Sequence, residues 1–75
     1  MPIFYFHTQW NGHEADVGEV ELQSLEAAKT EAIRFLGEIL ANHATRFIDE
    51  GQCRVRVAEP TGQTVMVVEA RSSSP

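Results

Sequence analysis

The sequence has little of several features that would assign a protein to a particular class. Its 75 residues include one cysteine, Cys53, so no disulfide can form within the chain, and a reducing compartment is favoured. No apolar run approaches the ~18 residues that span a bilayer, and the first residues lack the basic segment of a signal peptide. We therefore expect a cytoplasmic protein with no membrane span.

Basic residues are also few. Six Lys and Arg stand against eleven Asp and Glu, giving a net charge of −5, which disfavours non-specific binding to nucleic acid or anionic membranes. Glycine-rich phosphate loops, zinc-ligand spacings and nucleophile elbows are absent as well. We expect no cofactor, no metal and no enzymatic activity.

The longest feature that is present is an amphipathic stretch from Leu25 to Phe47. Ser24 is a good N-cap, because its hydroxyl can accept a hydrogen bond from the first helical turn. Steps of about 100° per residue gather one apolar arc, wider than a surface helix needs: Leu25, Ala28, Ala32, Ile33, Phe35, Leu36, Ile39, Leu40 and Phe47. A helix of this length would extend past a typical strand, so we expect a break near Asn42-His43-Ala44.

The segment before the helix alternates as a strand should over residues 2–8. Asn11-Gly12 predicts a tight hairpin turn, because both positions accept positive φ. A two-residue turn places Thr8 opposite Ala15 and His7 opposite Asp16. The returning strand, residues 13–17, is poor in β-branched residues and is followed by Gly18, so we expect it to be short.

The segment after the helix holds two β-rich runs, residues 52–59 and 64–70, around the turn Pro60-Thr61-Gly62. If Glu59 faces Gln63, the register pairs Val57 with Val65, Val55 with Val67, Arg56 with Met66 and Arg54 with Val68. The four valines then pack under the helix. Residues 1–70 are therefore predicted to form one α+β domain of order β-β-α-β-β, a four-stranded antiparallel sheet with one long helix on one face. Residues 71–75 are predicted to be a disordered tail.

One helix leaves the other face of this sheet uncovered. The predicted register lines that face with a mixed apolar and basic set, a possible interaction surface: Ile3, Tyr5, Arg54, Arg56, Met66 and Val68. Such faces often bind a partner, commonly another copy of the chain. We predict a homodimer, formed through this face or through the Phe35–Ile39 flank of the helix.

Three kinds of side chain have both a chemical and a structural interpretation. His7 with Asp16, near His13, could act as a general base with its carboxylate or as half a metal site, but no further ligand or nucleophile is spaced to join them. We favour a cross-strand hydrogen bond. We expect His43 to be buried or half-buried in the apolar arc, the alternative being a pH-responsive interface residue. Cys53 alternates with core valines and should pack as a small hydrophobe rather than react as a thiol.

Aromatic and arginine side chains suggest one further interpretation. Tyr5, Trp10, Arg54 and Arg56 could form a stacking platform for single-stranded nucleic acid. The excess of acidic residues argues against it, so we expect no nucleic-acid partner.

Three motifs resemble those of a known family. They are Met1-Pro2-Ile3-Phe4-Tyr5-Phe6-His7, Asp16-Val17-Gly18-Glu19 and the helix start Leu25-Glu26-Ala27-Ala28-Lys29-Thr30-Glu31-Ala32. Together they resemble a family of small bacterial proteins, domain of unknown function 6894, which begin M-P-x-[YF]-[FY]-F-H. That resemblance implies fold and size, because the family has no assigned activity. The second and third motifs also resemble HicB-type antitoxins in topology, although the antitoxin's DNA-binding extension is missing.

These observations favour a non-enzymatic interaction or regulatory module that self-associates. A nucleic-acid-linked regulator similar to an antitoxin is the first alternative. A minimal enzyme using His7 and Asp16 is the second.

Overall fold

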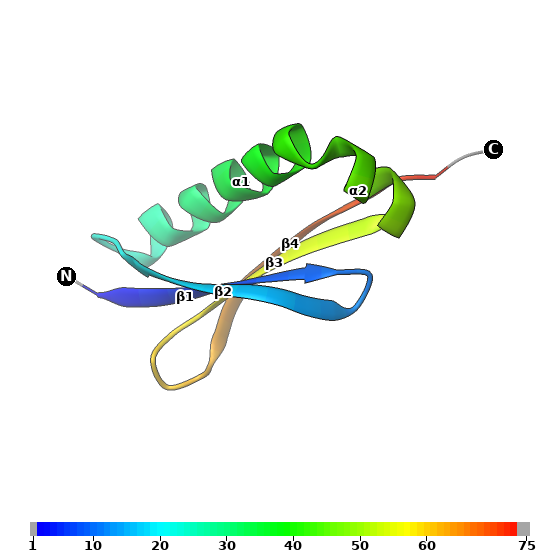
Figure 1. The fold of residues 1–75 in the computed structure, drawn as a ribbon. Helices are drawn as coiled ribbons and strands as arrows, with labels where there is room; N and C mark the ends of the chain where they lie inside the picture. Colours follow the sequence, from blue (N-terminus) through cyan, green and yellow to red (C-terminus); the bar gives the residue numbers. More distant parts are fainter. Residues whose placement is uncertain (1, 74–75) are drawn as a thin grey trace.

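The chain folds into one four-stranded antiparallel sheet with two helices on one face (Figure 1). The structure is a computed structural model and describes residues 2–73. Its elements are β1 (Ile3–Trp10), β2 (His13–Glu21), α1 (Leu25–Asn42), α2 (Ala44–Glu50), β3 (Gln52–Ala58) and β4 (Thr64–Arg71). The strand order is β2-β1-β3-β4, so the first strand of each hairpin is central. The predicted α+β class is confirmed.

The helical stretch begins and breaks where its sequence predicts. The Ser24 hydroxyl accepts a hydrogen bond from the Ala27 N–H at 3.1 Å. His43 has non-helical angles, φ −130° and ψ 43°, and separates α1 from α2. Gly51 ends α2 in the left-handed conformation, with φ 81°, which a glycine adopts without steric cost. Within residues 2–73, no helix has the length and apolar character to cross a membrane.

The end of the predicted domain lies further along the chain than expected. Arg71 is the last residue of β4, and the Ser72 N–H donates to the Gly51 carbonyl at 3.0 Å. The predicted disordered tail therefore does not begin at 71, and Ser74 and Pro75 lie outside the described residues.

The first hairpin has the predicted turn but not the predicted strand length or register. Asn11 and Gly12 both have positive φ, 49° and 85°. β2 nevertheless runs for nine residues, because Gly18 continues the strand opposite Phe6 instead of turning. A β-bulge leaves Ala15 without a partner, so Thr8 pairs with Asp16. His7 consequently lies opposite Val17, and its predicted pairing with Asp16 is wrong.

The second hairpin contains a similar irregularity. The Glu59 N–H donates to the Gln63 carbonyl at 2.9 Å, as the turn prediction requires. An extra residue at Val65 then shifts the register, pairing Val57 with Met66 and Val55 with Val68. Because one residue of slip moves every following side chain to the other face, the predicted pairing of the valines is wrong.

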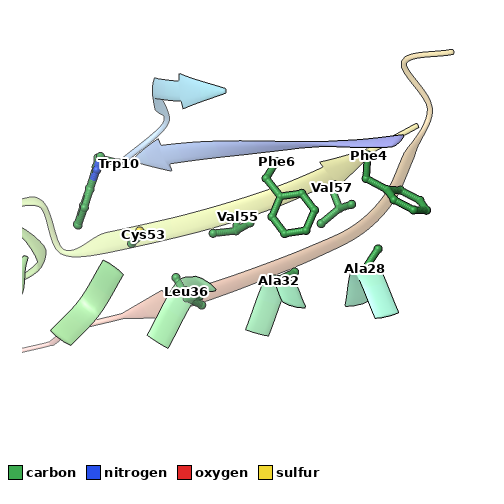
Figure 2. Close-up of a cluster of buried hydrophobic side chains, with 9 residues drawn as sticks. All are labelled: Phe4, Phe6, Trp10, Ala28, Ala32, Leu36, Cys53, Val55 and Val57. Carbon is green, nitrogen blue, oxygen red and sulfur yellow. The ribbon is translucent and has the colours of Figure 1, made fainter. Parts of the chain in front are cut away.

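The core lies between α1 and the two central strands. Figure 2 shows strand side chains pointing toward Ala28, Ala32 and Leu36 of α1. Both alanines are fully buried, which brings the helix backbone close to the sheet. The strands supply the remaining members of the cluster: Phe4, Phe6, Trp10, Cys53, Val55 and Val57. The predicted burial of Phe4, Phe6 and Leu36 is confirmed, whereas Ile39 is only half-buried.

The core predicts a large cost for shortening Leu36. Leu36→Ala should lower the free energy of unfolding by roughly 2–5 kcal/mol, because it removes a buried side chain and leaves a cavity. Leu25→Ala is the matched control, since Leu25 is 39% exposed and Leu36 9%. Urea denaturation measures both. Equal losses in the two variants would contradict this packing.

Candidate functional site

Two surfaces of the sheet are candidates, and the first is the face without a helix. Side-chain alternation from the observed registers places basic and neutral residues on the central strands, with acidic residues on the outer strands. The central set is Ile3, Tyr5, His7, Gln9, Arg54 and Arg56, and the outer set includes Glu14, Glu19 and Glu69.

The carboxylate of Glu14 contacts two side chains of the central set, His7 and Arg56. The Nδ1 atom of His7 lies 2.7 Å from Glu14 Oε1, and Arg56 Nη2 lies 3.8 Å from the same oxygen. Arg56 Nη1 also donates to the Thr64 hydroxyl at 3.2 Å. The carboxylate partner of His7 is thus Glu14 and not Asp16. This contact joins β1 to β2, which is the structural role favoured for a histidine–carboxylate pair.

Glu69 organises the other side of the same face. Its carboxylate accepts hydrogen bonds from Gln52 and, at 3.1 Å, from Arg71 Nε, and Arg54 Nη2 lies 3.5 Å away. The hydrogen bonds from Gln52 and Arg71 hold the pKa of Glu69 below the usual value for a glutamate. Arg54 Nε is buried and has no hydrogen-bond partner among residues 2–73.

The predicted interaction surface is only partly assembled. Ile3, Tyr5, Arg54 and Arg56 lie on the uncovered face. The prediction is wrong for Met66 and Val68. Both lie on the helix side and pack against the core, because the extra residue at Val65 reverses the direction of their side chains.

The predicted stacking platform is not assembled either. Trp10 lies on the helix side and is nearly fully buried, whereas Tyr5 lies on the opposite face. Side chains of a strand alternate between faces, so these two aromatic rings cannot stack successive bases together.

The second candidate lies on the helix side and was not predicted. A cavity of about 300 Å³, here called the hairpin–helix hollow, is lined by Thr8, Trp10, Ala15, Asp16, Phe35, Ile39, His43 and Arg46. It forms because α1 packs mainly over β3 and β4 and leaves the helix side of β2 uncovered near the hairpin turn, at Ala15 and Asp16. Asp16 reaches it only because the bulge at Ala15 turns Asp16 to this face.

Two side chains from the helix break approach Trp10 in this hollow. The guanidinium carbon of Arg46 lies 4.7 Å from the centre of the Trp10 ring, a cation–π contact. The His43 ring meets the same tryptophan edge-on, with centroids 6.4 Å apart. His43 is exposed, so its predicted burial is wrong; the break at this residue removes it from the apolar arc of α1.

Cys53 of β3 lies close by, directly opposite Trp10 of β1 in the sheet. It is fully buried, as predicted, and burial raises the pKa of its thiol while Arg46 partly lowers it. Groups of three or more His, Cys, Asp or Glu side chains that could hold a metal ion are not found in residues 2–73.

Comparison with known proteins gives a family but no activity. The model of a family described as Domain of unknown function (DUF6894) matches residues 3–71. The chain belongs to this family. No curated protein and no solved structure matches it, and these comparisons do not support the likeness to HicB-type antitoxins. Both candidate surfaces of this DUF6894 domain lie within the matched residues.

The Glu69 cluster predicts a pH effect on the DUF6894 domain. A carboxylate whose pKa is lower in the folded state stabilises the fold above its unfolded pKa, about 4.3, and that contribution is lost as the pH falls through the folded pKa. Glu69→Gln should therefore lose less stability than the wild type when the pH falls below about 4.3. Thermal denaturation from pH 7 to pH 2 measures this. Glu38→Gln, on the exposed side of α1, should follow the wild type. If Glu69→Gln also follows it, the cluster does not act as described.

Proposed function

We propose that this DUF6894 domain is a non-enzymatic cytoplasmic interaction module, and that it self-associates as a homodimer through its edge strand β4. The observation that carries the proposal is a set of apolar side chains around this edge, here called the β4 strip: Ile33, Leu40, Met66 and Val68 on the helix side, and Val67 on the face without a helix. The buried thiol of Cys53, the only cysteine, supports the reducing compartment in the proposal.

The two edges of the sheet differ in how they meet a second strand. Both edge strands carry a bulge, but β2 also carries four acidic residues, Glu14, Asp16, Glu19 and Glu21, which discourage pairing between copies. β4 pairs only with β3, so its outer backbone groups have no strand partner in the sheet. Its sequence, TVMVVEAR, has neither proline nor lysine. Of the two edges, β4 is therefore the one suited to strand addition.

On the helix side of the sheet, α1 continues the part of the strip that Met66 and Val68 form. Phe35 and Ile39 line the hollow beside β1 and β2. Ile33 and Leu40 lie on the other flank of α1, because about 100° separates successive residues around a helix. Ile33 is 57% exposed and Val67 45%, so neither is covered within one chain.

A second copy of the chain, related to the first by a two-fold axis beside β4, would cover both parts of the strip. Antiparallel pairing of two β4 strands satisfies the outer backbone groups and places the two α1 helices on the same face of one continuous sheet. The charges allow this, since β4 holds one acid, Glu69, and one base, Arg71, whereas two β2 edges would bring eight acids together at four per edge.

Sedimentation equilibrium tests the proposal. The wild type should be a dimer at high micromolar concentration. Val67→Lys should raise the dissociation constant at least tenfold, because it places a charge in the strip. Val17→Lys is the matched control, since Val17 is 47% exposed, lies on the same face of the sheet and belongs to the other edge strand.

Each other result contradicts a different part of the proposal. A wild type with the mass of one chain at every concentration would exclude self-association. Equal weakening by both variants would place the interface on the open face of the sheet, and weakening by Val17→Lys alone would place it at β2.

The two alternative functions have less support. A regulator that touches nucleic acid needs a continuous basic face, whereas Arg54 and Arg56 lie within 4 Å of Glu69 and Glu14 respectively. A minimal enzyme using His7 and Asp16 loses its pair, because these residues lie on opposite faces of the sheet.

A further inference from the structure

We propose that the hairpin–helix hollow binds a zwitterion with an apolar side chain, the chemical class of a free hydrophobic α-amino acid. This site lies on the flank of α1 away from the β4 strip. The proposal stands independently of self-association.

The size and floor of the hollow fit a small apolar group. Trp10, Phe35 and Ile39 supply aromatic and aliphatic walls. Its volume of about 300 Å³ is at the lower end of ligand sites, which range from roughly 300 to 1,000 Å³. An amino-acid side chain fits such a space, whereas a nucleotide or a lipid needs a larger one.

One acidic and one basic side chain line the hollow, so a ligand that pairs with both of them carries one positive and one negative group. Asp16 from β2 and Arg46 from α2 both line it, but they form no ion pair with each other. Asp16 accepts only the N–H of Val17, at 2.9 Å, among residues 2–73. Arg46 stacks on Trp10, and its Nε lies 3.7 Å from Glu50. The ammonium group of a ligand would donate a charge-assisted hydrogen bond to Asp16, and the carboxylate of the same ligand would accept one from Arg46.

Thr8 supplies an independent indication. It is only 6% exposed and lines the hollow; its side chain makes no hydrogen bond within residues 2–73, and its hydroxyl oxygen is accessible to water rather than buried. A threonine hydroxyl can donate one hydrogen bond and accept others. A polar group of a bound ligand would provide a partner at this position.

Trp10 makes the test direct, because it is the only tryptophan and lines the site. L-leucine should change its fluorescence saturably. Two analogues, 4-methylpentanoate without the ammonium and L-leucinamide without the carboxylate, should bind at least tenfold more weakly. No saturable change with L-leucine would overturn the site, and equal affinity for either analogue would overturn the zwitterion.

Paired variants assign the two charges. Asp16→Asn should remove the preference for L-leucine over 4-methylpentanoate. Arg46→Gln should remove the preference for L-leucine over L-leucinamide. Glu19→Gln, on β2 but on the other face, and Arg34→Gln, on the exposed side of α1, should bind as the wild type does. Because Arg46→Gln also alters the surroundings of Trp10, binding is read in parallel from the backbone amide shifts of residues 14–17. Equal effects of the variants and their controls would overturn the assignment.

Discussion

One helix cannot cover a four-stranded sheet, and most features of this molecule depend on that limit. A helix with its side chains is about 10 Å wide and strands lie about 4.8 Å apart, so one helix covers about two strands. Here Ala28 and Ala32 let α1 approach closely, and it packs mainly over β3 and β4. The side of the sheet formed by β2 is therefore left open, where the hollow forms, and the outer edge of β4 is left without a partner strand.

The elements and turns could be predicted because their signals are local. Ser24 caps its own helix, and Asn11-Gly12 and Gly62 supply the positive φ that their turns require. The registers could not be predicted, because each depends on one extra residue. Ala15 and Val65 are as compatible with a regular strand as with a bulge, and which of the two forms depends on how the whole hairpin pairs and packs rather than on the residue itself.

The same two bulges separate the predicted site from the observed one. Neither bulge changes the direction of four predicted side chains, which lie on the face where alternation places them: Ile3, Tyr5, Arg54 and Arg56. Met66, Val68 and Asp16 follow a bulge and lie on the opposite face from the one expected. The approach of Arg46 to Trp10 also depends on the helix break at His43, and no spacing in the sequence connects these two residues.

The two proposed binding surfaces share α1 but no side chain. Phe35 and Ile39 face the hollow, whereas Ile33 and Leu40 belong to the β4 strip on the other flank. A ligand and a second copy of the chain could therefore bind together without competing for contacts. A ligand that bound the dimer more tightly than the monomer would strengthen dimerisation by the same free energy per site, because linkage between binding equilibria is reciprocal. The helix that both surfaces use is the one element through which such a coupling would have to act, since Ala28 and Ala32 hold it against the strands as a single packed body.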